Sequence, residues 1–144
     1  MDLFCKKEYS DREIREMPVL ALAHIGDGVY ELLARMRALS EGTAQVNTLH
    51  KRTIKMVSAE AQAAAAKYIK ESLTEEEAAV LRRGRNAKPH HAPPHKTAAD
   101  VYPMATALEA LFGYLYLKGE YERVGLLWEM CEKVFEEKEN EGKT

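Results

Sequence analysis

Apolar residues in this chain recur three and four positions apart, and no stretch alternates convincingly as a half-buried strand would. The clearest case is Val19–Leu39, where Ile25, Val29, Leu32 and Met36 fall on one side of a helix. We therefore predict a helix over this segment that carries one apolar stripe.

Capping signals mark the helices that follow. Asn47 or Thr48 suits the start of one helix, and Ser58 either caps another or marks a bend within one long helix. From Ala59 to Glu71 the chain is rich in alanine, the residue with the strongest helix propensity. We expect these segments to be helical.

A capping box, Thr74 followed three residues later by Glu77, predicts a short helix that runs to about Arg83 and stops at Gly84. A further helix begins near Pro103, which suits a first helical turn. The last helix spans about Tyr121 to Glu136. The predicted inward positions of these two final helices are Leu108, Leu111, Phe112, Leu115, Leu126, Leu127, Met130 and Val134.

The segment Arg85–Asp100, with the sequence RNAKPHHAPPHKTAAD, holds three prolines and shows no apolar periodicity. It is predicted to be a loop of about residues 85–100, and loops of this length are often functional or disordered. The chain has 144 residues, which fits one domain over 1–144, with a tail that frays from about residue 137. The predicted fold class is all-α, a bundle of helices packed on helices.

Composition excludes several classes of protein. No apolar run approaches the ~18 residues of a membrane span, and the N-terminus is charged throughout, unlike a signal peptide. Cys5 and Cys131 are the two cysteines, and their spacing fits no metal motif. We expect two reduced thiols in a cytoplasmic protein that does not contact a membrane.

The net charge of −2 hides an uneven distribution. Acids are absent from 42–59 and again from 78–99, whereas the C-terminal stretch is rich in glutamate. The sequence therefore predicts two basic surfaces and an acidic tail. The basic residues of these two stretches are Lys51, Arg52, Lys55, Arg82, Arg83, Arg85, Lys88 and Lys96.

Two acids lie among small residues on otherwise bulky helices. Asp27 is flanked by Gly26 and Gly28, and Glu109 has alanine one turn before it and Gly113 one turn after it. Small residues let helices approach closely, so the two patches can face each other and bring the carboxylates together. Mg²⁺, which prefers oxygen ligands, would offset the cost of burying such a pair. The competing interpretation places Asp27 in a turn and pairs Glu109 with an arginine.

The same residues carry a resemblance. HIGDGVYELLAR resembles the signature helix of ribonuclease III catalytic domains, and TALEALFGYLYL resembles the second motif of that family. LHKRTIKMVSAEAQA and EEAAVLRRGRNAK look like the Mini-ribonuclease III branch, which lacks a double-stranded-RNA-binding domain. Two family carboxylates are missing, because Ala23 stands four residues before Asp27 and Thr106 three residues before Glu109.

The resemblance implies a metal-dependent endoribonuclease that cleaves double-stranded RNA and leaves 5′-phosphate and 3′-hydroxyl ends. Asp27 and Glu109 are then the catalytic metal ligands, for Mg²⁺ or for Mn²⁺ as a substitute. Thr106 either holds a metal-bound water or only packs, and Glu31 either orients water or forms an ordinary salt bridge. The expected RNA contacts are Lys51, Arg52, Lys55, Arg82, Arg83, Arg85 and Lys88.

The resemblance also implies partners. They are a second copy of the chain in a homodimer, precursor ribosomal RNA of the large subunit as substrate, and a ribosomal protein that assists. A non-catalytic RNA-binding factor for ribosome assembly is the first alternative, and a helical dimerisation module is the second. His90, His91 and His95 invite a transition-metal site, but exposure or RNA contact fits a proline-rich loop better.

Overall fold

The computed structural model describes residues 7–43, 45–87 and 99–142. Helices account for most of these residues, and no strand occurs among them, which confirms the predicted all-α class. The helices are α1 (Asp11–Glu16), α2 (Val19–Ser40), α3 (Val46–Val57), α4 (Ala59–Ile69), α5 (Glu75–Arg85), α6 (Val101–Leu117) and α7 (Tyr121–Glu141), with a 3₁₀ turn, η2 (Lys70–Ser72), after α4.

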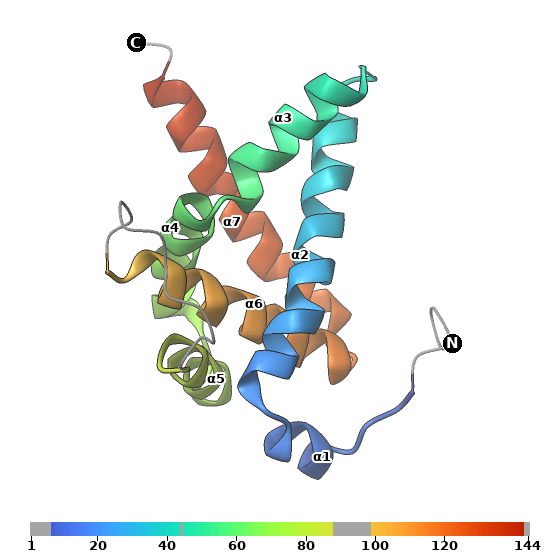
Figure 1. Ribbon diagram of the computed structural model, residues 1–144, viewed down its shortest axis with the longest axis vertical. Helices are drawn as coiled ribbons and strands as arrows, with labels where there is room; N and C mark the ends of the chain where they lie inside the picture. Colours follow the sequence, from blue (N-terminus) through green and yellow to red (C-terminus); the bar gives the residue numbers. More distant parts are fainter. Residues whose placement is uncertain (1–6, 44, 88–98, 143–144) are drawn as a thin grey trace.

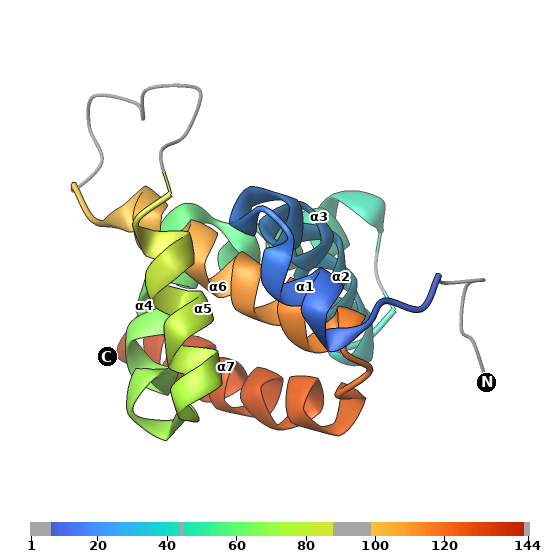
Figure 2. The ribbon, with the colours of Figure 1, turned by 90° about the horizontal axis from the view of Figure 1, so that it is seen from below.

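Helix α6 is the centre of the bundle, and α2, α4, α5 and α7 all contact it (Figure 1). Figure 2 shows α2 and α7 on opposite sides of α6. The inward positions predicted for α6, Leu108, Leu111, Phe112 and Leu115, are at most 1% exposed. A helix that is apolar on nearly every side must be covered from several directions, which explains the central place of α6.

Capping residues act where the sequence predicts them. The Ser58 hydroxyl accepts a hydrogen bond from the backbone N–H of Ala61, so Ser58 starts a separate helix rather than bending a long one. Thr74 and Glu77 form the predicted reciprocal capping box at the start of α5. Helix α1 was not predicted, although it begins with a second box formed by Ser10 and Glu13.

The predicted end of α5 is wrong, because the helix continues through Gly84 to Arg85. A side chain at Gly84 would place its Cβ 2.7 Å from the Cα of Ala107 on α6. This glycine therefore serves close packing between two helices rather than a helix stop. Two other boundaries also shift. Helix α3 begins at Val46 rather than after Asn47, and α7 stays helical to Glu141 where fraying was expected.

The apolar stripe of α2 is only partly buried, because Ile25 and Val29 pack against the core and the other two members do not. The buried residues of α2 are Leu22, Ala23, Gly26, Tyr30, Ala34 and Ala38. Leu32 and Met36, the other two residues of the stripe, are 51% and 60% exposed. The small residues face inward because they allow α6 to approach closely, and this leaves part of the apolar stripe on the surface. Leu126 on α7 was predicted to be buried and is 54% exposed.

Candidate active site

Helices α2 and α6 cross at two glycines that no other residue can replace without movement. A Cβ on Gly26 would overlap the carbonyl oxygen of Glu109, and one on Gly113 would overlap the carbonyl oxygen of Leu22. The contact is reciprocal, because a Cβ on Gly26 would lie 2.8 Å from the backbone nitrogen of Gly113, and one on Gly113 would lie 2.9 Å from that of Gly26. The two small-residue patches therefore face each other, as the sequence predicts.

Gly28 has a different environment, because a Cβ added there would meet nothing within 4 Å. It lies on the exposed side of α2 and makes no room for α6. The expectation that both glycines around Asp27 accommodate the facing helix thus holds for Gly26 and is wrong for Gly28.

The crossing brings Asp27 and Glu109 together. Asp27 lies inside α2 rather than in a turn, and its side chain is exposed, whereas Glu109 is partly buried. Burial raises the pKa of Glu109 to about 8, and a hydrogen bond to Asp27 and the charge of Asp27 act in the same direction. Two carboxyl groups that share one proton are the expected result when like charges meet away from water.

The alternative in which Glu109 pairs with an arginine is not what the structure shows. Among the described residues, the ion pairs involve other carboxylates, and the group that perturbs Glu109 is Asp27. The dyad, Asp27 with Glu109, is therefore an acidic pair without a cationic side chain to neutralise it in the described part of the chain.

This donor set suits one Mg²⁺ ion. Mg²⁺ is commonly held by one or two carboxylates, with waters and phosphate oxygens completing its octahedron. Asp27 and Glu109 supply that number of carboxylates, and a cation would relieve the repulsion that helps to hold the pKa of Glu109 at about 8. Within the described residues no group of three or more His, Cys, Asp or Glu side chains gathers into a larger cage. The residues present thus fit a metal with open positions.

The residues beside the dyad have distinct roles. Ala23, one turn before Asp27, is 8% exposed and packs in the core. Thr106, one turn before Glu109 on α6, is partly exposed. Glu31 accepts a hydrogen bond from Arg35 at 3.3 Å, and the side chains of Arg35 and Glu31 are 65% and 43% exposed. Glu31 therefore forms the surface salt bridge that was one of its two expected roles.

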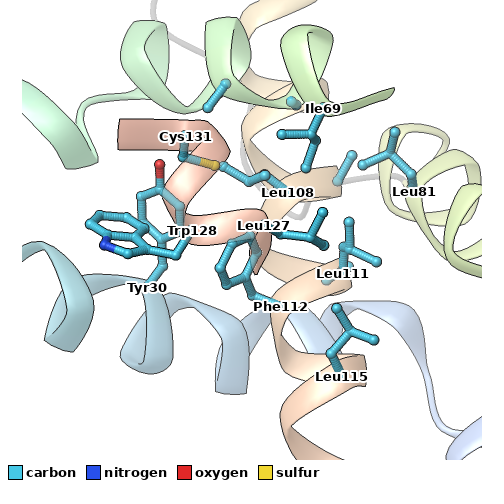
Figure 3. Packing of buried hydrophobic residues seen from close by; sticks show 14 of the residues in the cluster. Tyr30, Ile69, Leu81, Leu108, Leu111, Phe112, Leu115, Leu127, Trp128 and Cys131 are labelled. Carbon is cyan, nitrogen blue, oxygen red and sulfur yellow. The ribbon is translucent and has the colours of Figure 1, made fainter. Parts of the chain in front are cut away.

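Sequence reasoning missed Tyr30, which lies one turn after Asp27 and is 0% exposed. Its ring meets Phe112 of α6 and Trp128 of α7 edge to face (Figure 3). Burial raises its pKa well above its ordinary value, with a smaller contribution from the Cys131 side chain and another from Glu109. The signal in the sequence was its spacing, because Tyr30 is the aromatic residue on a helix face that otherwise carries small residues such as Gly26 and Ala34.

The basic residues divide into two groups. Arg52 donates to the carbonyl oxygens of Ala38 and Gly42, at 3.1 and 2.8 Å, and so caps the C-terminal end of α2. Arg83 donates to the carbonyl oxygen of Met17 at 3.1 Å and ties α5 to the junction between α1 and α2. The exposed basic residues from the predicted RNA contacts, apart from Arg83, are Lys51, Lys55, Arg82 and Arg85. Lys88, His90, His91 and His95 lie outside the described residues.

Two further features bear on chemistry. Cys131 is buried, and burial raises the pKa of its thiol to about 12, so it is not a nucleophile at neutral pH. A groove of about 630 Å³ between α3 and the end of α7 is lined by Arg37, Lys55 and Phe135 among others, and does not include the dyad. In the described part of the chain, none of the helices has the length and apolarity needed to cross a bilayer.

A helical bundle with paired carboxylates at a glycine crossing fits the ribonuclease III class, and residues 20–120 match the family model of the Ribonuclease III domain. Individual relatives agree. Mini-ribonuclease 3 of Symbiobacterium thermophilum is 47% identical over 108 residues, which cover 75% of this chain and 82% of that protein. Mini-ribonuclease 3 of Clostridium tetani is 39% identical over 141 residues, 96% of this chain and 93% of that one.

A crystal structure of a protein from Fusobacterium nucleatum superposes with a TM-score of 0.75 at 32% identity. The superposition covers 83% of this chain and 97% of that one. The chain therefore belongs to the ribonuclease III family, in its Mini-ribonuclease III branch, and it is an endoribonuclease.

Proposed function

We propose that the protein is a metal-dependent endoribonuclease that cleaves double-stranded RNA, with Asp27 and Glu109 as its catalytic metal ligands. The observation that carries this proposal is the contact of the two carboxylates at a partly buried position, where the pKa of Glu109 rises to about 8. Mg²⁺ is the expected ion, and Mn²⁺ accepts the same oxygen ligands.

A divalent cation bound here would act as a Lewis acid on a phosphate oxygen and lower the pKa of water. Attack of that water on phosphorus with loss of the 3′ oxygen would leave the 5′-phosphate and 3′-hydroxyl ends that the family resemblance implies. The protein supplies the geometry. Asp27 and Glu109 project from two helices whose backbones are in contact at Gly26 and Gly113. The two carboxylates therefore need little movement to bind a cation together. The exposure of Asp27 leaves one side of the pair open to an RNA phosphate.

Thr106 is the neighbour that we assign to water. Thr106 lies one helical turn from Glu109 and is partly exposed, so its hydroxyl can hold a water next to the metal. We assign Glu31 to the pair with Arg35 and not to the reaction.

The substrate is proposed to be duplex RNA, and precursor ribosomal RNA of the large subunit is the candidate that the family resemblance suggests, in the cytoplasm and with the help of a ribosomal protein. Double-stranded RNA is bound mainly through its shape, phosphates and 2′-hydroxyls, so exposed cations are the residues that matter. Lys51 and Lys55 on α3 and Arg82 and Arg85 on α5 are exposed and are our RNA contacts. Arg52 and Arg83 contribute by holding backbone in place.

A homodimer is the proposed assembly, and the exposed apolar stripe supports it. Leu32, Met36 and Leu39 on α2 are 51%, 60% and 55% exposed, and Val46 on α3 is 78% exposed. A row of large apolar side chains on neighbouring helices is costly in water and typical of an interface. Two copies that meet at α2 would place two dyads in one particle, one for each RNA strand.

Cleavage of a synthetic RNA duplex in Mg²⁺ tests the proposed function. We expect the wild type to cut duplex RNA and to leave a single strand of the same sequence intact. Asp27→Asn and Glu109→Gln should bind the duplex in a filter-binding assay without cutting it. Normal cutting by either variant would contradict the site, and binding without cutting by the wild type would favour the assembly-factor alternative.

A further inference from the structure

Two aromatic rings connect the helices that carry the dyad. Tyr30 lies one turn after Asp27 on α2, and Phe112 lies one turn after Glu109 on α6. Their ring centroids are 5.2 Å apart with planes at 83°, an edge-to-face contact, and both side chains are 0% exposed. The contact therefore lies one helical turn from both carboxylates and joins the same two helices.

A third ring holds Tyr30 from another direction. The centroid of Trp128 on α7 lies 5.1 Å from that of Tyr30, with planes at 84° (Figure 3). Edge-to-face pairs depend on angle as well as distance, and they add to the stabilisation that comes from the area the rings bury. Because rings from α6 and α7 pack against the Tyr30 ring from two directions, these contacts restrict the rotation of α2 about its own axis.

The hydroxyl of Tyr30 does not account for the position of this ring. Among the described residues, it is the buried side-chain polar atom without a partner of hydrogen-bond geometry. Figure 3 shows it on the side of the ring that faces Cys131. The thiol of Cys131 is the polar group next to this hydroxyl, and a thiol is a weak hydrogen-bonding group, so the main stabilising part of Tyr30 is the ring.

We propose that Tyr30 is a positioning residue whose ring sets the rotation of Asp27 relative to Glu109, and thereby the affinity of the pair for a divalent cation. The inference rests on the proposed function, because it takes the dyad to be the metal site. A residue one turn from a ligand can act in this way, because the groups around metal ligands fix the orientation of those ligands. Loss of a supporting group around metal ligands typically costs about 10–100-fold in affinity or activity.

The experiment compares Tyr30→Phe, which keeps the ring, with Tyr30→Leu, which removes it. Mn²⁺ is titrated into the protein without RNA, and the free ion is followed by electron paramagnetic resonance. We expect Tyr30→Leu to bind Mn²⁺ about tenfold more weakly and to lower kcat on duplex RNA by about 10–100-fold. KM for the duplex should stay within about twofold of wild type, and Tyr30→Phe should match wild type in every measurement.

Ile69→Ala provides the matched control, because Ile69 is also 0% exposed but lies on α4, a helix that carries neither carboxylate of the dyad. All variants are measured at a temperature where circular dichroism shows them folded. Ile69→Ala should lose stability and keep its Mn²⁺ affinity, which separates positioning from general core damage. The emission of Trp128, the single tryptophan, should shift in Tyr30→Leu and not in Tyr30→Phe.

Several results would overturn the inference. They are unchanged Mn²⁺ affinity and kcat in Tyr30→Leu, equal losses in Ile69→Ala, or equal losses in Tyr30→Phe, which would assign the effect to the hydroxyl. If the wild type binds Mn²⁺ with the expected Tyr30 pattern but does not cut RNA, the positioning role stands and the proposed function fails. If the wild type does not bind Mn²⁺, both are contradicted.

Discussion

At the scale of single residues, the fold raises the pKa of the Glu109 carboxyl group. It is partly buried next to Asp27, and its pKa rises from the ordinary 4.5 to about 8. The folded protein therefore binds more protons than the unfolded chain between these values, when no divalent cation is present. Stability must then fall as the pH rises through this range, because the carboxylate is ionised at a cost only in the folded state.

Glu109→Gln should remove that dependence, since the amide stays neutral. Without divalent cations, in a chelator, we expect the variant to match the wild type near pH 5 and to exceed its free energy of unfolding by roughly 1–3 kcal/mol near pH 8.5. Urea unfolding across this pH range measures the difference. Glu129→Gln, an exposed site on α7, is the control and should follow the wild type at every pH. Parallel curves for wild type and Glu109→Gln would contradict the shifted pKa.

At the scale of helices, the crossing of α2 and α6 is the feature on which the site depends. Gly26 and Gly113 permit backbone contact, whereas Gly28 on the same helix as Gly26 faces open space. The two glycines beside Asp27 therefore offer a matched pair of substitutions, identical in chemistry and opposite in environment.

Gly26→Ala should lower the free energy of unfolding by about 3 kcal/mol or more, because its methyl group overlaps the backbone of α6. Gly28→Ala should raise it by up to about 1 kcal/mol through better helix propensity. Chemical denaturation of both variants measures these changes. Similar stability in the two would mean that the helices do not cross as closely as described.

At the same scale, part of the helix arrangement could be predicted from the sequence. Capping residues such as Ser58 and Thr74 act within one turn, so the starts of α4 and α5 could be predicted from local chemistry. The small-residue patches at Asp27 and Glu109 predicted that two helices meet, and they do. Which face of α2 turns inward could not be predicted, because it depends on how closely α6 packs against it. The larger side chains of Leu32 and Met36 gave the stronger periodic signal. On the inner face, however, they would prevent the close approach of α6. The helix end predicted at Gly84 is wrong for a similar reason, because this glycine serves close packing against α6, which the local sequence does not reveal.

At the scale of the whole molecule, the apolar stripe left outside by this packing has a consequence for assembly. The exposed side chains of Leu32, Met36 and Leu39 line one face of α2, and the chain offers them no cover within the described residues. A second copy with the same stripe is self-complementary by symmetry.

Sedimentation at micromolar concentration should therefore show a dimer, and the double substitution Leu32→Glu with Met36→Glu should give a monomer that stays helical. Leu126→Glu is the matched control, because Leu126 is 54% exposed on α7 and lies outside the stripe. It should leave the dimer intact. A monomeric wild type would contradict the proposed interface, and so would a dimer that the double substitution at Leu32 and Met36 leaves unchanged.

The proposed reaction requires Asp27 and Glu109 to act as one unit. Its most direct test is the single-turnover rate of duplex cleavage for wild type, Asp27→Asn, Glu109→Gln and the double variant. Groups that act together are strongly non-additive, so each single substitution should lower the rate by at least about 10³-fold, and the double variant should lose little more. Losses that add on a logarithmic scale, or a single variant that cuts at the wild-type rate, would contradict the claim.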